Sequence, residues 1–118
     1  MPSEEHRWIR LRIYIGETDR YHGTPLYLHI LRILRRNGIR GATVLKGLAG
    51  YGSHSMIHLP AVLRLSEDLP LVIETIDEEE KINKVLPEIM NVVKEGLITR
   101  EEVEVLFYGH KGIDRRKH

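Results

Sequence analysis

The chain has 118 residues, of which 42% are hydrophobic and 30% charged, and this length fits one domain over residues 1–118 with a core of its own. The absence of cysteine excludes disulfides, thiolate zinc sites and a cysteine nucleophile. A net charge of +1 argues against a general binder of polyanions. No apolar run approaches the roughly 20 residues of a membrane helix, and the N-terminal residues lack an apolar signal core, so we expect a cytoplasmic protein.

Charge is divided unevenly along the chain. Residues 1–64 carry ten Lys or Arg and four Asp or Glu, whereas residues 65–104 carry four and twelve. Faces of opposite charge could join copies of the chain in a homo-oligomer, although charge alone favours two solvated faces. The chain also has three Asn, no Gln and no Cys, and this scarcity of thermolabile residues points to a thermophilic source.

The N-terminal third predicts a strand followed by a helix. Residues 8–15 alternate strictly, which is the pattern of a strand with one face in the core. Thr24 and Pro25 fit the N-cap and the first position of a helix. That helix is predicted to end at Asn37-Gly38.

Three further strands are predicted. The second covers 41–48, and residues 49–60, which have no helical stripe, predict a long loop or hairpin tip. Pro70 opens a third, largely apolar strand over 71–76. The fourth is expected over 102–107, where apolar and other residues alternate.

A second helix separates the last two strands. Asp77 and Glu80 have the spacing of a capping box, and residues 82–90 keep helical periodicity. Pro87 lies inside this pattern and is expected to kink the helix or split it. Residues 94–99 are expected to form a loop.

The predicted order β-α-β-β-α-β is that of a ferredoxin-like α+β sandwich, with two helices on one face of an antiparallel sheet. Residues 109–118 follow as a basic tail. The other sheet face is expected to meet water or another subunit, and its predicted side chains are Arg10, Arg12, Tyr14, Glu102 and Glu104.

A glycine-rich run, Gly47 to Gly52, follows the second strand. Glycine lets backbone N–H groups approach a phosphate and permits positive φ. The spacing matches neither the Walker motif nor the dinucleotide fingerprint. Taken alone, the run is better explained by a strand end or bulge.

Histidines raise the question of a metal site. His54 and His58 are four residues apart, which on a helix could hold one ion. The segment does not look helical, and in a strand the two would lie about 13 Å apart. His22, His29 and His110 lie elsewhere in the sequence.

A possible acid–base cluster occupies the loop after the first strand, where Glu17, Asp19 and His22 lie close in sequence. Two carboxylates and an imidazole can exchange protons with a substrate. No nucleophile or oxyanion donor accompanies them, so no catalytic site is complete.

Four segments together resemble an uncharacterised bacterial and archaeal family that is similar in fold to the PII nitrogen-regulatory proteins. The resemblance covers residues 8 to 108 and rests on IYIGETDRYHGTPLY, GIRGATVLKGLAGYGSHSMIH, LSEDLPLVIETIDEEEKI and EGLITREEVEV. It implies a ferredoxin-like subunit and, by analogy with PII, a homotrimer whose sheets line the centre.

The resemblance also implies a ligand site. PII proteins bind adenine nucleotides between subunits, using the base of a long T-loop, the loop after the second helix and basic residues near the C-terminus. Carried over by position, the T-loop falls at 50–60, and the loop after helix 2 has one glycine where PII proteins have a glycine-rich cradle. The implied ligand-binding residues are Lys46, Gly47, Gly50, Tyr51, Gly52, His54, Gly96, Leu97, His110 and Lys111.

Three hypotheses follow. The first is a non-enzymatic PII-like regulator that binds AMP, ADP or ATP between subunits and acts through the 50–60 loop on a transporter, channel or enzyme. The second is a metal-binding trimer that resembles the CutA proteins and uses His54 and His58. The third is a small enzyme that uses Glu17, Asp19 and His22.

Overall fold

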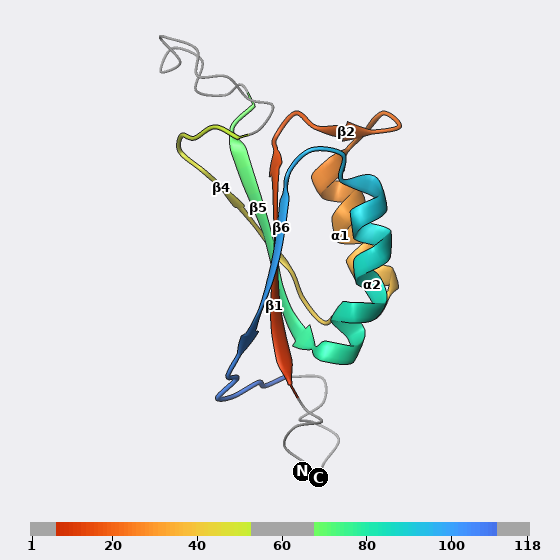
Figure 1. Ribbon diagram of the computed structural model, residues 1–118, viewed down its shortest axis with the longest axis vertical. Helices are drawn as coiled ribbons and strands as arrows, with labels where there is room; N and C mark the ends of the chain where they lie inside the picture. Colours follow the sequence, from red (N-terminus) through yellow and green to blue (C-terminus); the bar gives the residue numbers. More distant parts are fainter. Residues whose placement is uncertain (1–6, 53–67, 111–118) are drawn as a thin grey trace.

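The computed structural model describes residues 7–52 and 68–110. An antiparallel sheet of four strands, in the order β4-β5-β1-β6, carries both helices on one face (Figure 1). The strands are β1 (Trp8–Gly16), β4 (Thr43–Lys46), β5 (Pro70–Glu78) and β6 (Leu97–Val103). The helices are α1 (Leu26–Arg36) and α2 (Glu79–Val92), and a separate small hairpin consists of β2 (Arg20–Tyr21) and β3 (Thr24–Pro25). The predicted ferredoxin-like sandwich is confirmed.

The core lies between the sheet and the helices. The alternation of β1 buries Ile9, Leu11, Ile13 and Ile15, as predicted. The helices add buried residues at helical spacing: Leu26, Ile30, Ile33 and Leu34 from α1, and Ile82, Val85, Ile89 and Val92 from α2. Each such side chain contributes about 1.5–3 kcal/mol when it leaves water. Neither described helix is long and apolar enough to cross a membrane.

The predicted start of α1 is wrong in detail. Thr24 and Pro25 belong to β3, and α1 begins at Leu26 with no side-chain cap. The hairpin replaces the cap, because its fold brings the Asp19 carbonyl oxygen 2.8 Å from the Leu26 nitrogen and so satisfies the N–H group there. His22, with φ 50°, makes the tight turn of this hairpin together with Gly23.

The capping box predicted for α2 is also wrong. Asp77 is the penultimate residue of β5 and is fully buried, where it pairs with Arg40, and the N-cap residue is Glu78, which makes no side-chain cap bond. Pro87 does not split α2, which runs unbroken to Val92. Pro87 is exposed, so the carbonyl that loses its helical partner there lies on the solvent side.

Strand boundaries differ from the prediction at two places. β4 covers only 43–46 of the predicted 41–48, and β6 covers 97–103, so the predicted loop 94–99 is shorter. β6 stops early because Val103 lies opposite Trp8, the first residue of its partner strand β1. Residues 104–107 therefore have no strand beside them in the described part of the chain, despite their alternating sequence.

The sheet face turned away from the helices is here called the outer face. The strand register places different acidic residues on this face from those that the sequence predicted. Residues directly opposite in an antiparallel pair share a face. Arg10 lies opposite Glu101, and Arg12 lies opposite Glu74, so these acids belong to the outer face. Glu102 lies opposite the buried Ile9, on the helix side, and Glu104 lies beyond the strand, so the predicted placement of both acids was wrong.

Candidate ligand-binding site

The outer face is not covered by any described helix (Figure 1). Two ion pairs cross it, Arg10 with Glu101 and Arg12 with Glu74, whose Nε and Oε1 atoms are 3.1 Å apart. The hydrogen bond that Arg12 donates to Glu74 raises the pKa of Arg12. Leu45, 52% exposed, and Leu97 add apolar surface to the same face. A face with this mixture of charged and apolar groups can accept another protein surface.

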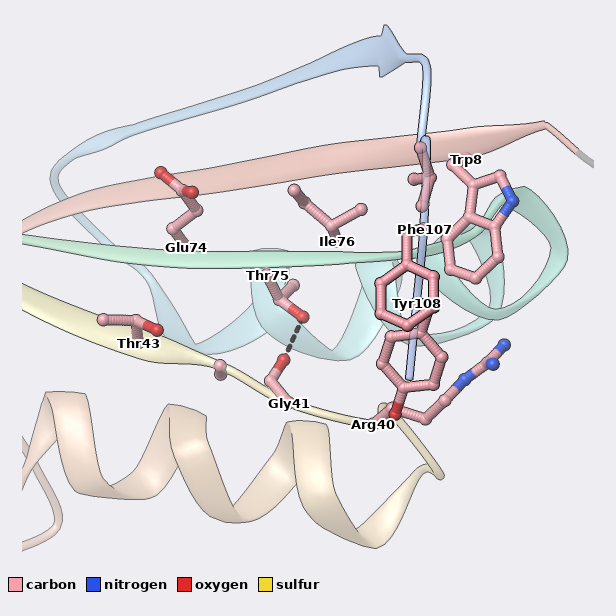
Figure 2. A pocket seen from close by; sticks show the side chains of 11 residues that line it. Trp8, Arg40, Gly41, Thr43, Glu74, Thr75, Ile76, Phe107 and Tyr108 are labelled. Atoms are coloured by element: carbon pink, nitrogen blue, oxygen red, sulfur yellow. Dashed lines mark hydrogen bonds between the residues drawn. The ribbon is translucent and has the colours of Figure 1, made fainter. Parts of the chain in front are cut away.

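A pocket of about 480 Å³ opens at one end of the outer face (Figure 2). It lies where β1 begins, where the chain enters β4, and where β5 approaches α2. The segment after β6 closes its far side. The lining residues are Trp8, Arg40, Gly41, Ala42, Thr43, Glu74, Thr75, Ile76, Val105, Phe107 and Tyr108.

The Arg40 side chain is held in one position at this pocket by several neighbours. Its guanidinium carbon lies 5.1 Å from the Trp8 ring centre and 5.3 Å from that of Tyr108. Its Nη2 atom lies 3.1 Å from Asp77 Oδ1 and 2.8 Å from Glu78 Oε2. Hydrogen bonding to Glu78 raises the pKa of Arg40. A planar cation is therefore held rigidly beside two aromatic rings, an arrangement that favours stacking with another flat group.

Polar groups lie on the sheet next to these rings. Thr43 and Glu74 are direct partners on β4 and β5 and both face outward (Figure 2). Thr75 donates its hydroxyl hydrogen bond to the Gly41 carbonyl oxygen, which fixes the chain where it enters β4. The pocket thus combines aromatic walls with the outward hydroxyl of Thr43 and the carboxylate of Glu74, a composition that suits a small heteroaromatic ligand.

The glycine-rich run lies at the opposite end of the sheet. The Gly47 nitrogen donates to the Pro70 carbonyl oxygen at 2.7 Å, and a Cβ atom on Gly47 would lie 2.8 Å from Pro70 Cγ. Gly50 has φ +155°, and a Cβ atom there would lie 3.1 Å from the same Cγ atom. Packing against Pro70 thus accounts for both glycines. Lys46 projects from this end, with Nζ 3.0 Å from Glu17 Oε2.

The other predicted site residues are divided between the two ends. Gly96 packs against the end of β1, since a Cβ atom on it would lie 2.4 Å from the Tyr14 carbonyl oxygen. Gly96 and Leu97 thus lie at the same end of the sheet as Lys46. They belong to the opposite edge of the sheet, three strand spacings or about 14 Å away from β4. Tyr51 and Gly52 are exposed. His110 lies near the pocket, its ring centre 6.4 Å from that of Tyr108. His54, His58 and Lys111 lie outside the described residues.

The residues of the enzyme hypothesis have structural contacts. Glu17 pairs with Lys46, and Asp19 Oδ2 accepts a hydrogen bond from the Gly16 nitrogen at 3.0 Å. The His22 ring packs edge-on against Tyr21, with 4.3 Å between ring centres. Over residues 7–52 and 68–110, no group of three His, Cys, Asp or Glu side chains could hold a metal ion.

The sequence patterns did not point to Trp8, Arg40 and Tyr108. They lie far apart in the chain, and only the fold brings them together. One signal was available: Asp77 is an acid at the end of an apolar strand, and a buried acid needs a partner such as Arg40.

A family model, DUF190 (Uncharacterized ACR, COG1993), matches residues 8–105. The chain belongs to the DUF190 family. A UPF0166 protein of Methanocaldococcus jannaschii is 48% identical over 89 residues, which are 75% of this chain and 82% of that protein. A UPF0166 protein of Aquifex aeolicus is 42% identical over 97 residues, or 82% of this chain and 91% of the other.

Solved structures show the same fold. The chain is similar to CPII of Thiomonas intermedia K12, a nitrogen regulatory PII-like protein bound to ADP, AMP and bicarbonate, with a TM-score of 0.62, 19% identity and coverage of 85% of this chain and 96% of the other. It is also similar to a putative PII-like signaling protein of Thermus thermophilus, with a TM-score of 0.58, 18% identity and coverage of 83% and 88%. At these identities the likeness shows the PII-like fold alone.

Proposed function

We propose that this DUF190 protein is a PII-like regulator that binds an adenine nucleotide between copies of itself in a homotrimer. The observation that carries the proposal is the pocket beside Arg40, where aromatic rings and a fixed guanidinium lie next to Thr43 and Glu74. The PII-like fold and the nucleotides bound to a protein of that fold support it.

The adenine base is assigned to the pocket. A purine ring stacks well on Trp8 or Tyr108, because aromatic faces bind flat rings with little loss of side-chain freedom. Its exocyclic amino group is a donor, which suits the carboxylate of Glu74 and the hydroxyl oxygen of Thr43. The ion pair with Arg12 holds the Glu74 carboxylate in position.

The phosphates need a second copy of the chain. Lys46 and the N–H groups near Gly47 can bind anionic oxygens, but they lie at the far end of the sheet. From Ile76 in the pocket to Pro70 beside Gly47, β5 extends over six residue steps, or about 20 Å. ADP does not reach across this distance within one chain. A cleft between two copies, formed by the pocket of one copy and the sheet end that carries Lys46 in the next, would bring both groups within reach of one nucleotide.

The output of this regulator is assigned to the 50–60 loop, which follows the Lys46 end directly in the sequence. Nucleotide contacts at the base of a loop can shift its population between conformations, and such a loop can then bind or release a target protein. A transporter, channel or enzyme would be that target.

Calorimetric titration with AMP, ADP and ATP tests the nucleotide proposal. Thr43→Val removes the hydroxyl from the pocket, and Thr99→Val is a matched control, an exposed threonine on the same face but outside the pocket. We expect Thr43→Val to weaken binding about fivefold, the value of one neutral hydrogen bond, while Thr99→Val binds like the unaltered chain. Absence of heat with all three nucleotides on the unaltered chain would refute the proposal.

A further inference from the structure

The segment after β6 exposes large apolar side chains. Residues 104–108 read EVLFY, and Leu106 and Phe107 are 87% and 85% exposed. The alternation and the β-branched and aromatic residues are typical of a strand. Within residues 7–52 and 68–110, however, this segment is not part of any strand.

None of the described strands pairs with this segment. β1 begins at Trp8, which faces Val103, so β6 has no partner strand beyond that point, and within the described ranges no backbone hydrogen bond involves residues 104–109. The segment instead runs across the ends of β1 and β5 toward Arg40 (Figure 2). Unpaired backbone groups beside exposed apolar side chains form a template for pairing with another chain.

Among the described strands, β4 has a neighbour, β5, on one edge only, and its other edge is open. Gly47 donates to Pro70, and hydrogen bonds alternate along an antiparallel pair, so Thr43 and Leu45 also direct their backbone groups toward β5. Val44 and Lys46 therefore direct theirs away from the sheet. Their free N–H and C=O groups can accept one more strand.

We propose that residues 104–107 of one copy pair antiparallel with β4 of a second copy. In this register Glu104 lies opposite Lys46, and Val105 lies opposite Leu45. Leu106 and Phe107 then lie opposite Val44 and Thr43. Opposite charges meet at one end, and Val105 covers the exposed Leu45, whereas a parallel register would place Phe107 beside Lys46. This inference rests on the proposed assembly of copies and names the segments that join them.

The pairing exchanges a contact that already exists within one chain. Residues 41–43 and the segment containing Phe107 and Tyr108 line the same pocket. Exchange of such a contact between identical chains is a low-cost route to assembly. Tyr108 of the first copy would follow Phe107 and lie opposite Ala42 of the second copy, near the Arg40 of that second copy. One wall of the nucleotide pocket would then come from the neighbouring copy.

The geometry also favours a closed ring. The interface uses two different surfaces, the segment after β6 on one copy and the β4 edge on the next. Such a head-to-tail contact closes into a ring when its rotation allows, and a trimer is the smallest closed ring beyond a dimer.

Cysteine cross-linking tests the register, and the natural chain contains no cysteine to interfere. A Leu45→Cys chain is mixed with a tagged Val105→Cys chain and oxidised, so that a disulfide between the two has to be intermolecular. Val105 and Leu45 would form a non-hydrogen-bonded pair with Cα atoms about 4.5 Å apart, within the range of a disulfide. We expect a covalent heterodimer in the folded mixture and none in denaturant.

Two controls fix the meaning of the result. Leu106→Cys would place its sulfur on the sheet face opposite to that of Leu45→Cys, and Met90→Cys lies at an exposed position on α2. Neither variant should form more disulfide with Leu45→Cys than the same mixture forms in denaturant. Equal cross-linking of all three, or none with Val105→Cys, would overturn the register. Light scattering separates the two proposals: an oligomer without the Val105 cross-link overturns only this pairing, whereas a monomer overturns the pairing and the proposed assembly together.

Discussion

Arg40 holds Asp77 by two separate groups. The backbone nitrogen of Arg40 lies 2.9 Å from Asp77 Oδ2, and its Nη2 atom lies 3.1 Å from Oδ1. The Asp77 side chain is fully buried, whereas that of Arg40 is partly exposed toward the pocket. The pair thus joins the end of β5 to the entry of β4 and presents a fixed cation to the candidate site.

Replacing Asp77 by alanine is expected to destabilise the fold, because this fully buried carboxylate accepts hydrogen bonds from the backbone nitrogen and the guanidinium of Arg40 and from the Glu78 nitrogen. Each buried donor that is left without an acceptor costs about 1–3 kcal/mol. Glu78→Ala is the control, since its exposed contact with Arg40 is worth about 1 kcal/mol or less. Urea unfolding of both variants measures the difference, and equal loss of stability would contradict this role of Asp77.

Gly96→Ala is expected to lower the free energy of unfolding by about 1–3 kcal/mol, since a Cβ atom would meet the Tyr14 carbonyl oxygen at 2.4 Å in a backbone with φ +152°. Gly52→Ala meets nothing within 4 Å and should change it by about 0.5 kcal/mol or less. Thermal unfolding of the two variants checks this, and a Gly96→Ala chain as stable as Gly52→Ala would show that the close approach does not exist.

Lys46→Ala is expected to weaken nucleotide binding about tenfold or more, because a charge-assisted hydrogen bond is worth about 1.5–3 kcal/mol. Its effect on stability should be small, since the pair with Glu17 is exposed. Lys84→Ala, an exposed lysine on α2, is the control. Unchanged nucleotide affinity of the Lys46→Ala chain in calorimetry would show that the phosphates bind elsewhere. Gly50→Val would not be a suitable test of this site, because valine would strain this backbone against Pro70.

Lys111→Ala should weaken nucleotide binding less than Lys46→Ala, because the sequence places Lys111 in a basic tail where solvent screens its charge. The same calorimetric titrations provide the comparison. A larger loss with Lys111→Ala would make the tail the main phosphate contact.

The assembly is expected to be a trimer of the 13.7 kDa chain. Leu106→Pro removes an N–H group from the proposed intermolecular strand and should shift light-scattering mass toward the monomer, whereas Leu106→Ala keeps the donor and should shift it less. A trimer equally stable to dilution in both variants would argue against strand pairing by this segment.

The sequence predicted most of the fold because strong local patterns decided it. The alternation of residues 8–15 and the apolar stripes of both helices correspond directly to the buried face of β1 and to the core. The errors arose where tertiary pairing overrides local pattern. Residues 104–107 look like a strand but find no partner within the described part of the chain, and Asp77 looks like a cap but pairs with Arg40.

The candidate site was predicted less well. The glycine-rich run is conspicuous in the sequence, yet packing against Pro70 explains Gly47 and Gly50. The pocket residues Trp8, Arg40 and Tyr108 form no local motif. Their meeting depends on the strand order and on the path of the chain after β6, neither of which a sequence pattern states.

Titration of the unaltered protein with ADP, followed by the emission of Trp8, tests the central claim most directly, because Trp8 is the single tryptophan and lies in the pocket wall. An adenine base stacked there changes the surroundings of the indole ring. We predict a saturable change in Trp8 emission that follows the calorimetric binding curve. Emission that stays constant while ADP saturates the protein would show that the base binds elsewhere and would contradict this account.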